Sequence, residues 1–297
     1  MTVLSTLSSD LASAVASVGP NVVQVEARRG VPASGTIWTT EGIVVTANHA
    51  VVRDEDIKVV LADGKSSVAT LIGRDPTTDL ALLRLENGNP ASSKWIGAGD
   101  LRVGHLVLSL GRPGKTVRAA LGIISALGES WRTPSGGTVD SYIQTDAPSY
   151  PGFSGGPLAT VEGDILGIGT SGLLRGTTVT VPTTTVKAVV DELLKRGRIS
   201  RGYLGVGIQP VRLPSALGRQ LGQETALLVV SVEPDSPGER AGLVLGDTII
   251  AIGNSQVRHW DDLLGVLGKD EIGKTVTVRI LRGGQPQQLK ATIGERP

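Results

Sequence analysis

The chain has 297 residues, no cysteine, 40 glycines and few aromatic side chains, namely four Trp, three Tyr and one Phe. This length is typical of two domains, and a hydrophobic fraction of 40% excludes an intrinsically disordered chain. The absence of cysteine excludes disulfide frameworks, thiolate nucleophiles and cysteine metal sites. Three scattered histidines argue against a histidine-rich metal site, and a formal net charge of +1 provides no global field for nucleic acid.

The N-terminal region predicts a short amphipathic helix rather than a targeting segment. Apolar side chains recur there at helical spacing before a Gly-Pro pair: Leu4, Leu7, Leu11 and Val15, followed by Gly19 and Pro20. The run lacks the charged start and the unbroken apolar core of a signal peptide, and nothing in the chain reaches the roughly 18 apolar residues of a membrane helix. We therefore expect no transmembrane segment, signal peptide or membrane anchor in this chain, which would be either cytoplasmic or a trimmed mature form.

The sequence pattern between residues 22 and 181 is typical of a β domain. Short apolar runs separated by Gly, Pro, Asp and Asn lie at residues 43–46, 57–61, 81–85, 105–110 and 165–168. Many short strands with turns between them predict an all-β barrel or sandwich. A helical pattern over residues 186–194 then ends at Lys195, Arg196 and Gly197, and cations suit the C-terminal end of a helix. We place the domain boundary just beyond it, so that the first domain covers residues 1–199.

Residues 200–297 predict a smaller α+β domain. Strands are expected over residues 227–232, 248–252 and 275–281, and short helices over residues 237–241 and 260–267. The chain as a whole is therefore expected to be mainly β, with the helices concentrated at its start, at the boundary and in the second domain.

One glycine-rich segment carries the strongest sign of chemistry. Its sequence from Tyr150 to Leu158 is Tyr-Pro-Gly-Phe-Ser-Gly-Gly-Pro-Leu, in which flanking glycines permit a tight turn that exposes the Ser154 hydroxyl and gathers N–H groups beside it. The alternative is an ordinary glycine-rich turn between strands. A serine nucleophile also needs a base and a group that orients the base. His49 follows one apolar strand and Asp79 precedes another, although each alone is more often structural.

In the order His49, Asp79, Ser154, these residues and their surroundings resemble the HtrA (DegP-like) family of chymotrypsin-like serine proteases. Three further segments resemble that family at matching places: residues 110–114 (Leu-Gly-Arg-Pro-Gly), 122–128 (Gly-Ile-Ile-Ser-Ala-Leu-Gly) and 144–147 (Gln-Thr-Asp-Ala). The resemblance covers nearly the whole chain. It implies two perpendicular β-barrels with the three residues in the cleft between them.

The second domain resembles a PDZ domain. Tyr203-Leu204-Gly205-Val206 is similar to the carboxylate-binding loop, and residues 236–247 are similar to the segment before the central strand. Loop N–H groups can capture a peptide carboxylate while an exposed strand, expected at residues 205–209, pairs with the peptide. The opposite wall of the groove is expected to carry three leucines: Leu263, Leu264 and Leu267.

The resemblance implies roles for the site residues. Ser154 would attack a peptide carbonyl, His49 would take and return the proton, and Asp79 would orient the imidazole. Backbone N–H groups of Gly152 and Ser154 would form the oxyanion hole. The specificity pocket would be walled by Thr170, Ser171 and Gly172. Because no acid lies there, we expect cleavage after small or medium apolar residues, and no metal or other cofactor is required.

Phe153 departs from the family pattern, which usually has Asn at that place. A polar side chain helps to anchor the loop, whereas Phe can only pack. Either the ring finds an apolar pocket that holds the hole open, or the loop rests collapsed until a substrate or partner reorders it. Tyr150 and Phe153 belong to a gathering of aromatics, with Trp131 and Tyr142, that we expect to set the conformation of this loop.

The predicted function is an ATP-independent serine endopeptidase for unfolded or damaged proteins, a role in protein quality control. Its PDZ domain would bind peptide C-termini and regulate activity. The alternative is a peptide-binding or holdase protein with a dormant protease domain. The resemblance also implies a homotrimer or higher oligomer and a periplasmic or other extracytoplasmic location, while no nucleic-acid partner is expected.

Overall fold

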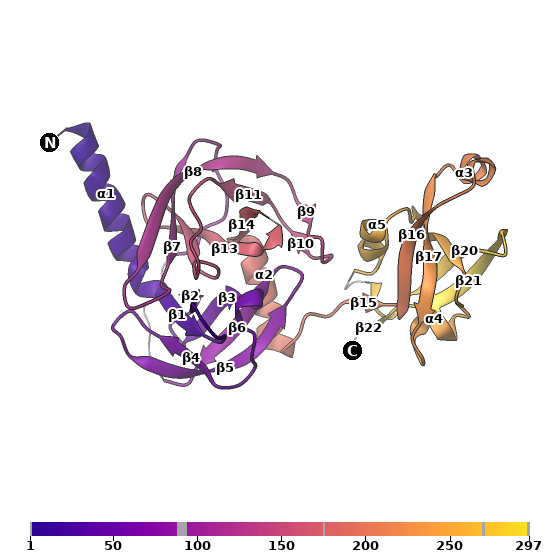
Figure 1. The fold of residues 1–297 in the computed structure, drawn as a ribbon, viewed down its shortest axis with the longest axis horizontal. Coiled ribbons are helices and arrows are strands. Elements are labelled where there is room, and N and C mark those ends of the chain that lie inside the picture. The colour runs from indigo at the N-terminus through magenta and orange to yellow at the C-terminus, as the bar shows by residue number, and fades with distance from the viewer. Residues whose placement is uncertain (1, 88–93, 175, 269–270, 296–297) are drawn as a thin grey trace. The chain divides into compact units, whose positions relative to one another are not determined.

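The computed structural model describes residues 2–87, 94–174, 176–268 and 271–295. The chain divides into two compact units, residues 1–199 and residues 200–297 (Figure 1). Each unit has its own apolar core, and each is described in turn.

The first unit begins with helix α1 (Val3–Val18), which continues into a 3-10 turn, η1 (Gly19–Asn21). The Thr2 side chain caps the helix by accepting a hydrogen bond from the Ser5 N–H at 3.3 Å. Ala14 and Val18 near the end of α1 are buried, whereas Val3 and Leu4 are 86% and 77% exposed. In Figure 1 the first turns of α1 accordingly extend away from the barrels.

Two closed antiparallel barrels make up most of the first unit, as predicted from the family resemblance. The strands of the first barrel are β1 (Val22–Glu26), β2 (Ala33–Ile37), β3 (Ile43–Ala47), β4 (Ile57–Val60), β5 (Ser66–Asp75) and β6 (Leu80–Leu85), in the order β1-β2-β3-β6-β5-β4. Those of the second are β7 (Leu106–Gly111), β8 (Arg118–Gly128), β11 (Tyr142–Thr145), β12 (Pro157–Thr160), β13 (Ile165–Leu174) and β14 (Thr177–Pro182), in the order β11-β14-β13-β12-β7-β8. A small hairpin pairs β9 (Trp131–Arg132) with β10 (Thr138–Val139).

An apolar layer joins the two barrels. Helix α2 (Thr183–Arg196) takes part in it and ends, as the sequence predicts, at Gly197, whose φ of 70° is left-handed. The layer takes side chains from β3, β6, β13, β14 and α2: Ile43, Val45, Leu80, Leu82, Ile168, Val179, Val181, Val186, Val189, Val190 and Leu193. Burial of this layer fixes the barrels against each other, and with them the loops that meet between them.

The second unit is built on a sheet whose strand order is β16-β17-β18-β20-β21. These strands are β16 (Val206–Arg212), β17 (Thr225–Val232), β18 (Thr248–Ile252), β20 (Thr275–Arg282) and β21 (Gln285–Thr292), with β19 (Ser255–Gln256) paired to β18 and a separate pair of β15 (Gly202–Tyr203) with β22 (Gly294–Glu295). Helices α4 (Pro237–Arg240) and α5 (Trp260–Val266) lie where the sequence predicts helices. A further helix, α3 (Ser215–Leu221), was not predicted.

Candidate functional site

His49 and Asp79 are brought together by the pairing of two neighbouring strands. His49 lies on a 3-10 turn, η2 (Asn48–Ala50), directly after β3, and Asp79 directly precedes β6. Because Ala47 pairs with Leu80, the two side chains meet at the same end of the first barrel. The His49 ring nitrogen Nδ1 lies 2.7 Å from Asp79 Oδ2, and the His49 backbone N–H donates to Asp79 Oδ1 at 2.9 Å.

The Asp79 carboxylate is held from three sides. Besides the two donors of His49, the hydroxyl of Thr170 on β13 donates to Asp79 Oδ2. The Asp79 side chain is only 4% exposed, and its backbone φ of 56° lies in the left-handed region. Since a carboxylate can only accept here, His49 Nδ1 must be the donor, which leaves Nε2 as the basic nitrogen of the ring.

Gly172 lies against this His–Asp pair. A Cβ atom at this position would lie 2.5 Å from Asp79 Oδ2 and 2.6 Å from His49 Nδ1, so no side chain is tolerated there. Together with Thr170, Gly172 brings strand β13 of the second barrel into contact with residues of the first. Thr170, Ser171 and Gly172 are predicted from sequence to wall a specificity pocket, and in the structure all three lie against the proposed triad.

Ser154 lies in the loop between β11 and β12 and is 8% exposed. Its hydroxyl lies 3.3 Å from the hydroxyl of Ser171, the residue between Thr170 and Gly172. Among the described residues, no hydrogen bond joins Ser154 directly to His49. Catalytic hydrogen bonds of this kind often tighten only when substrate is bound, so the arrangement suits a site without substrate.

Strand β2 of the first barrel holds the loop that carries Ser154. The Ser34 hydroxyl donates to the Gly152 carbonyl at 2.6 Å, and the Ser34 N–H donates to the Ser154 carbonyl at 3.2 Å. The Thr36 hydroxyl donates to the Gly155 carbonyl at 3.0 Å. Ser34 and Thr36 were not predicted from sequence, although two hydroxyl residues at alternate positions of a buried strand are a usable signal.

With its carbonyls held by β2, the loop leaves two donors free. Gly152 has a φ of 88°, a conformation that favours glycine. Among the hydrogen bonds of the described residues, neither the Gly152 N–H nor the Ser154 N–H is a donor, although both residues are buried. Buried N–H groups normally have acceptors, so two free ones beside a serine hydroxyl are suited to bind a developing oxyanion.

The Phe153 side chain is packed in the interior of the first unit. The side chain is 3% exposed, and its ring lies against Gly111 of β7, where an added Cβ would be 2.7 Å from the ring. The Tyr150 ring meets it edge-on, with centroids 5.3 Å apart and an interplanar angle of 72°. Trp131 and Tyr142 form a second, separate edge-on pair with centroids 5.6 Å apart.

Arg112 connects the N-terminal segment to this loop. Its guanidinium is buried and donates to the carbonyls of Val22, Gly19 and Lys115 at 2.6, 2.9 and 2.9 Å. Burial lowers the pKa of the Arg112 guanidinium, which nevertheless stays protonated. The Arg112 backbone N–H donates to the Ser34 hydroxyl at 2.7 Å, and that hydroxyl in turn holds the Gly152 carbonyl.

In the second unit, the loop of residues 203–206 meets one end of α5. The Gly202 N–H donates to the Leu267 carbonyl at 3.1 Å, which places the C-terminal end of α5 beside this loop. Gly205 has a φ of 70°. Leu263 and Leu267 share an apolar core with Leu204, Val206 and Ile208, and Leu264 stays half-exposed on α5. Tyr203 donates its hydroxyl to Glu233.

Neither a metal cluster nor a membrane-spanning helix is found in the described parts of the chain. No group of three or more His, Asp or Glu side chains is placed there to hold a metal ion. No described helix is both long enough and apolar enough to cross a bilayer.

Comparison with known proteins matches both units. Residues 33–168 match the model of a trypsin-like peptidase domain, and residues 202–293 match that of a PDZ domain. The solved structure of the HtrA-type protease AlgW with tripeptide has a TM-score of 0.72 and 31% identity, over 97% of this chain and 97% of that one. The chain belongs to the HtrA family. The family and the fold of two barrels followed by a PDZ domain, both predicted from sequence, are thereby confirmed.

Other HtrA-family relatives agree. The serine endoprotease from Yersinia pestis is 29% identical with a TM-score of 0.74, over 97% of this chain and 98% of that one. Two proteins named "Probable periplasmic serine endoprotease DegP-like" are 36% identical: that of Marinomonas sp. over 270 residues and that of Brucella suis over 275 residues. These matches cover 89% of this chain but only 57% and 52% of the relatives, so the chain spans little more than half of their length.

Proposed function

We propose that this HtrA-family chain is a serine endopeptidase with Ser154 as nucleophile and His49 and Asp79 as its base and orienting carboxylate. The observation that carries the proposal is the His49–Asp79 pair at 2.7 Å, with Thr170 as a further donor to the carboxylate. His49 Nε2 takes the Ser154 proton as the hydroxyl oxygen attacks the peptide carbonyl, and returns it to the leaving amine. Asp79 stabilises the imidazolium that forms in between.

The free N–H groups of Gly152 and Ser154 are proposed to bind the carbonyl oxygen as it becomes an oxyanion. Such a donor typically contributes about 2.7 to 4 kcal/mol to lowering the barrier. The hydrogen bonds from Ser34 and Thr36 support this role, because they direct the loop carbonyls toward β2 and away from the substrate. We do not favour the dormant-protease alternative, since it was motivated by Phe153, and that ring is packed beside an anchored loop.

Covalent labelling by a fluorophosphonate and degradation of casein test the activity. The parent chain and a Ser125→Ala control, in which an exposed hydroxyl of β8 is removed, are expected to label and to degrade casein. The Ser154→Ala variant is expected to do neither. A parent chain that fails in both assays, even with C-terminal peptides present, would favour the holdase function instead.

The second unit is proposed to bind peptide C-termini along β16, the edge strand of its sheet. The carboxylate would be bound by N–H groups of the loop at residues 203–206, and Leu263 and Leu267 would line the groove for an apolar last residue. A peptide with a free C-terminus is therefore expected to bind, while the same peptide with a C-terminal amide is not.

Further functional features follow the family and remain proposals for this chain. They are ATP-independent action on unfolded or damaged proteins, regulation by the PDZ domain, cleavage after small or medium apolar residues, assembly as a homotrimer or larger oligomer, and an extracytoplasmic location. The name "periplasmic" carried by the curated relatives supports the last of these. Cleavage-site profiling in a denatured protein tests the substrate preference, and a dominance of Lys or Arg before the cut would contradict it.

A further inference from the structure

We propose that the second unit recognises acidic residues upstream of the peptide C-terminus. They would bind in a cationic cavity at the end of the groove that lies away from the carboxylate loop. The proposal rests on the proposed function of this unit as a binder of peptide C-termini. The cavity measures about 880 Å³ and opens between the end of β16 and the start of α5. Its lining residues come from four segments: Arg212 and Leu213; Ser215, Gly218 and Arg219 of α3; residues 222–225; and Arg258 with His259.

The cavity lies in line with the groove because α5 runs beside β16 in the opposite direction. At one end the Gly202 N–H donates to the Leu267 carbonyl, next to the proposed carboxylate loop. At the other end Arg212, the last residue of β16, and His259, the N-cap of α5, line the same cavity. A peptide that fills the groove from the loop outward therefore points its upstream residues into this cavity.

The backbone of β16 shows where a bound peptide would need other contacts. The Gly205 carbonyl accepts from the Glu233 N–H, and the Leu213 N–H donates to the Glu224 carbonyl. The backbone N–H and C=O groups of the odd-numbered residues of this strand therefore point toward β17. The backbone groups of the even-numbered residues point toward the open edge of the sheet; these residues are Val206, Ile208, Pro210 and Arg212. Pro210 has no N–H to donate, so the ladder of hydrogen bonds to a peptide is incomplete from that residue onward.

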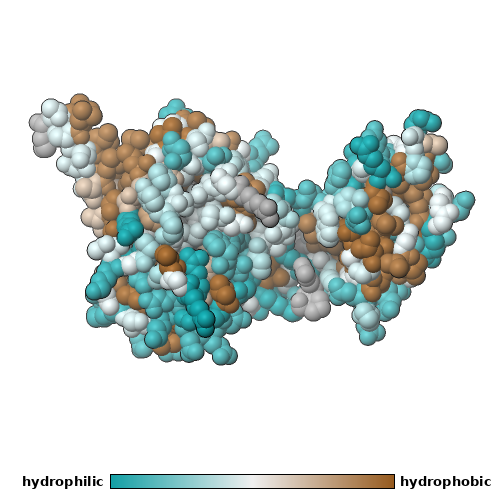
Figure 2. Space-filling view, viewed as in Figure 1, coloured by the Kyte–Doolittle hydropathy of each residue, from teal (hydrophilic) through white to brown (hydrophobic). Residues whose placement is uncertain are grey.

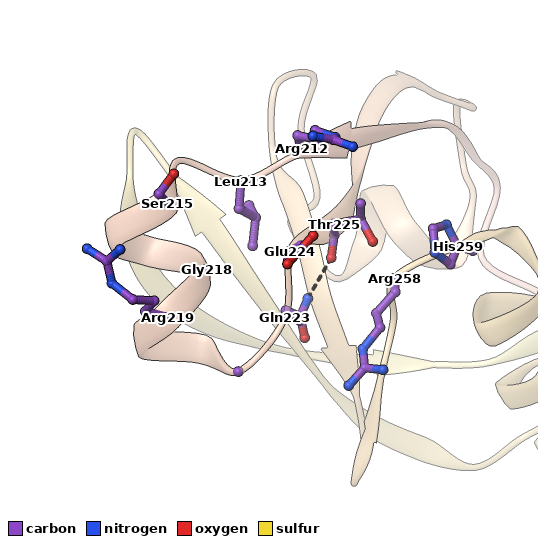
Figure 3. A pocket seen from close by; sticks show the side chains of 11 residues that line it. Arg212, Leu213, Ser215, Gly218, Arg219, Gln223, Glu224, Thr225, Arg258 and His259 are labelled. Atoms are coloured by element: carbon purple, nitrogen blue, oxygen red, sulfur yellow. Dashed lines mark hydrogen bonds between the residues drawn. The ribbon is translucent and has the colours of Figure 1, made fainter.

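Strand geometry sets the distance from the C-terminus. In antiparallel pairing, the peptide residue opposite Arg212 lies about six residues before the one opposite Val206. Side-chain contacts must hold this part of the peptide, and the cavity offers three arginines against one glutamate, Glu224. Figure 3 shows Arg212 and Arg258 on different segments of the lining, with the Arg258 side chain directed away from Arg212, while Arg219 projects outward from α3.

Two of the lining arginines, Arg212 and Arg258, are available for a carboxylate. In the described part of the chain, neither Arg212 nor Arg258 forms an ion pair, and the Arg258 guanidinium donates to the Gln256 amide oxygen at 2.5 Å. Of the two acids in the first turn of α5, Asp261 and Asp262, the second accepts from the backbone N–H groups of Arg258 and His259 at 2.7 and 3.1 Å. A guanidinium fork matches carboxylate geometry, so the cavity is suited to Glu or Asp side chains.

Fluorescence anisotropy with the full chain tests the inference, using the Ser154→Ala background so that peptides are not cut. Three labelled decapeptides end in Ser-Thr-Leu-Val and carry Glu, Gln or Lys at the positions about five to seven residues before the last. The Glu peptide is expected to bind about two- to fivefold more tightly than the Gln peptide for each favourable ion pair, and the Lys peptide is expected to bind more weakly.

Two variants locate the effect. The Arg212→Gln plus Arg258→Gln double variant is expected to bind the Glu and Gln peptides equally. The control Lys290→Gln, an exposed residue of β21 at the opposite edge of the sheet, is expected to keep the preference. Equal affinity of the parent for the Glu and Gln peptides, or loss of the preference in the control, would overturn the inference. Failure of all three peptides to bind would overturn the proposed peptide binding itself.

Discussion

At the residue scale, Gly172 contributes to the site by having no side chain. Its α-carbon faces the atoms that join His49 to Asp79, so an added methyl group would displace one of them. We expect Gly172→Ala to lower kcat/KM by about 10- to 100-fold, because small misplacements of catalytic groups are costly. The matched control is Gly114→Ala, since a Cβ at Gly114 meets no atom within 4 Å. Equal activity of both variants, measured on one peptide substrate, would contradict this account.

Ser34 positions the loop that carries Ser154, through hydrogen bonds with the Gly152 carbonyl and the Arg112 N–H. Removing its hydroxyl leaves the Gly152 carbonyl without its donor and the Arg112 N–H without its acceptor. A lost buried hydrogen bond costs about 1 to 3 kcal/mol, so Ser34→Ala is expected to lower kcat by about ten- to a hundredfold.

Ser67→Ala is the control for Ser34, because it removes another buried hydroxyl of the same barrel, one that donates to the Val68 carbonyl. Fluorophosphonate labelling rates should fall for Ser34→Ala well beyond any change for Ser67→Ala. Similar rates in the two variants, with similar melting temperatures, would show that the loop keeps its shape without Ser34.

Phe153 shows what could not be predicted at this scale. Its departure from the family pattern was visible in the sequence, and so were the two possible outcomes. The place of the ring depends on Gly111, a residue of β7 that leaves room for it only because it lacks a side chain. The sequence around Phe153 does not indicate that Gly111 is its partner.

At the scale of elements, strand and helix positions followed from hydrophobic patterns, but several boundaries and one helix did not. The expected strand at residues 165–168 extends in the structure to Leu174, through Thr170, Ser171 and Gly172. These three residues interrupt the apolar pattern because they lie against His49, Asp79 and Ser154 rather than in the core. Helix α3 was missed because only Leu217 and Leu221 mark its apolar face, too few for a periodic signal.

The stability of the C-terminal end of helix α1 is expected to depend on Arg112. Replacing it by Met would leave the carbonyls of Gly19, Val22 and Lys115 without their donor, and hydrogen bonds to a charged group contribute about 1.5 to 3 kcal/mol each. We expect Arg112→Met to lower the free energy of unfolding of the first unit by about 3 kcal/mol.

The exposed Arg118, at the start of β8, provides the control as Arg118→Met. Urea unfolding gives the stability of both variants, and amide hydrogen exchange gives the local opening of α1. Exchange in residues 14–22 should accelerate in Arg112→Met alone. Unchanged exchange there would mean that packing of Ala14 and Val18, rather than the guanidinium, holds this segment.

At the scale of the whole molecule, the sequence was sufficient for the family and for the two-unit organisation, and it singled out the His49, Asp79 and Ser154 of the proposed site. Each of these has a local signature: a residue next to a strand, a glycine-rich turn or a loop motif. The supports of the site were not predictable in the same way. Ser34, Thr170 and Arg112 act through contacts between segments that are distant along the chain, and only the closed barrels bring those segments together.

The two units have separate cores, so acid is expected to affect them differently. In the second unit, the buried Asp247 accepts from the Arg282 guanidinium at 2.7 and 2.8 Å and from the Val244 N–H at 2.9 Å. Burial alone would raise the pKa of the Asp247 carboxyl, but these hydrogen bonds and the Arg282 charge outweigh it, so the pKa lies below its ordinary value. The ion pair therefore stabilises the unit above pH about 4, and that stability is lost as the pH falls through the lowered pKa.

Differential scanning calorimetry across pH tests this expectation on the whole chain. The parent should show separate transitions, and the one assigned to residues 200–297 should shift down by several degrees below pH about 4. Asp247→Asn should melt lower at neutral pH, because Arg282 loses its charged partner, and should lack this part of the acid shift. The exposed Asp63, which pairs with Lys65 in the first unit, supplies the control as Asp63→Asn, and the transition of residues 200–297 should keep its acid shift there. An Asp247→Asn chain whose second unit keeps the full acid shift would show that other carboxylates carry it.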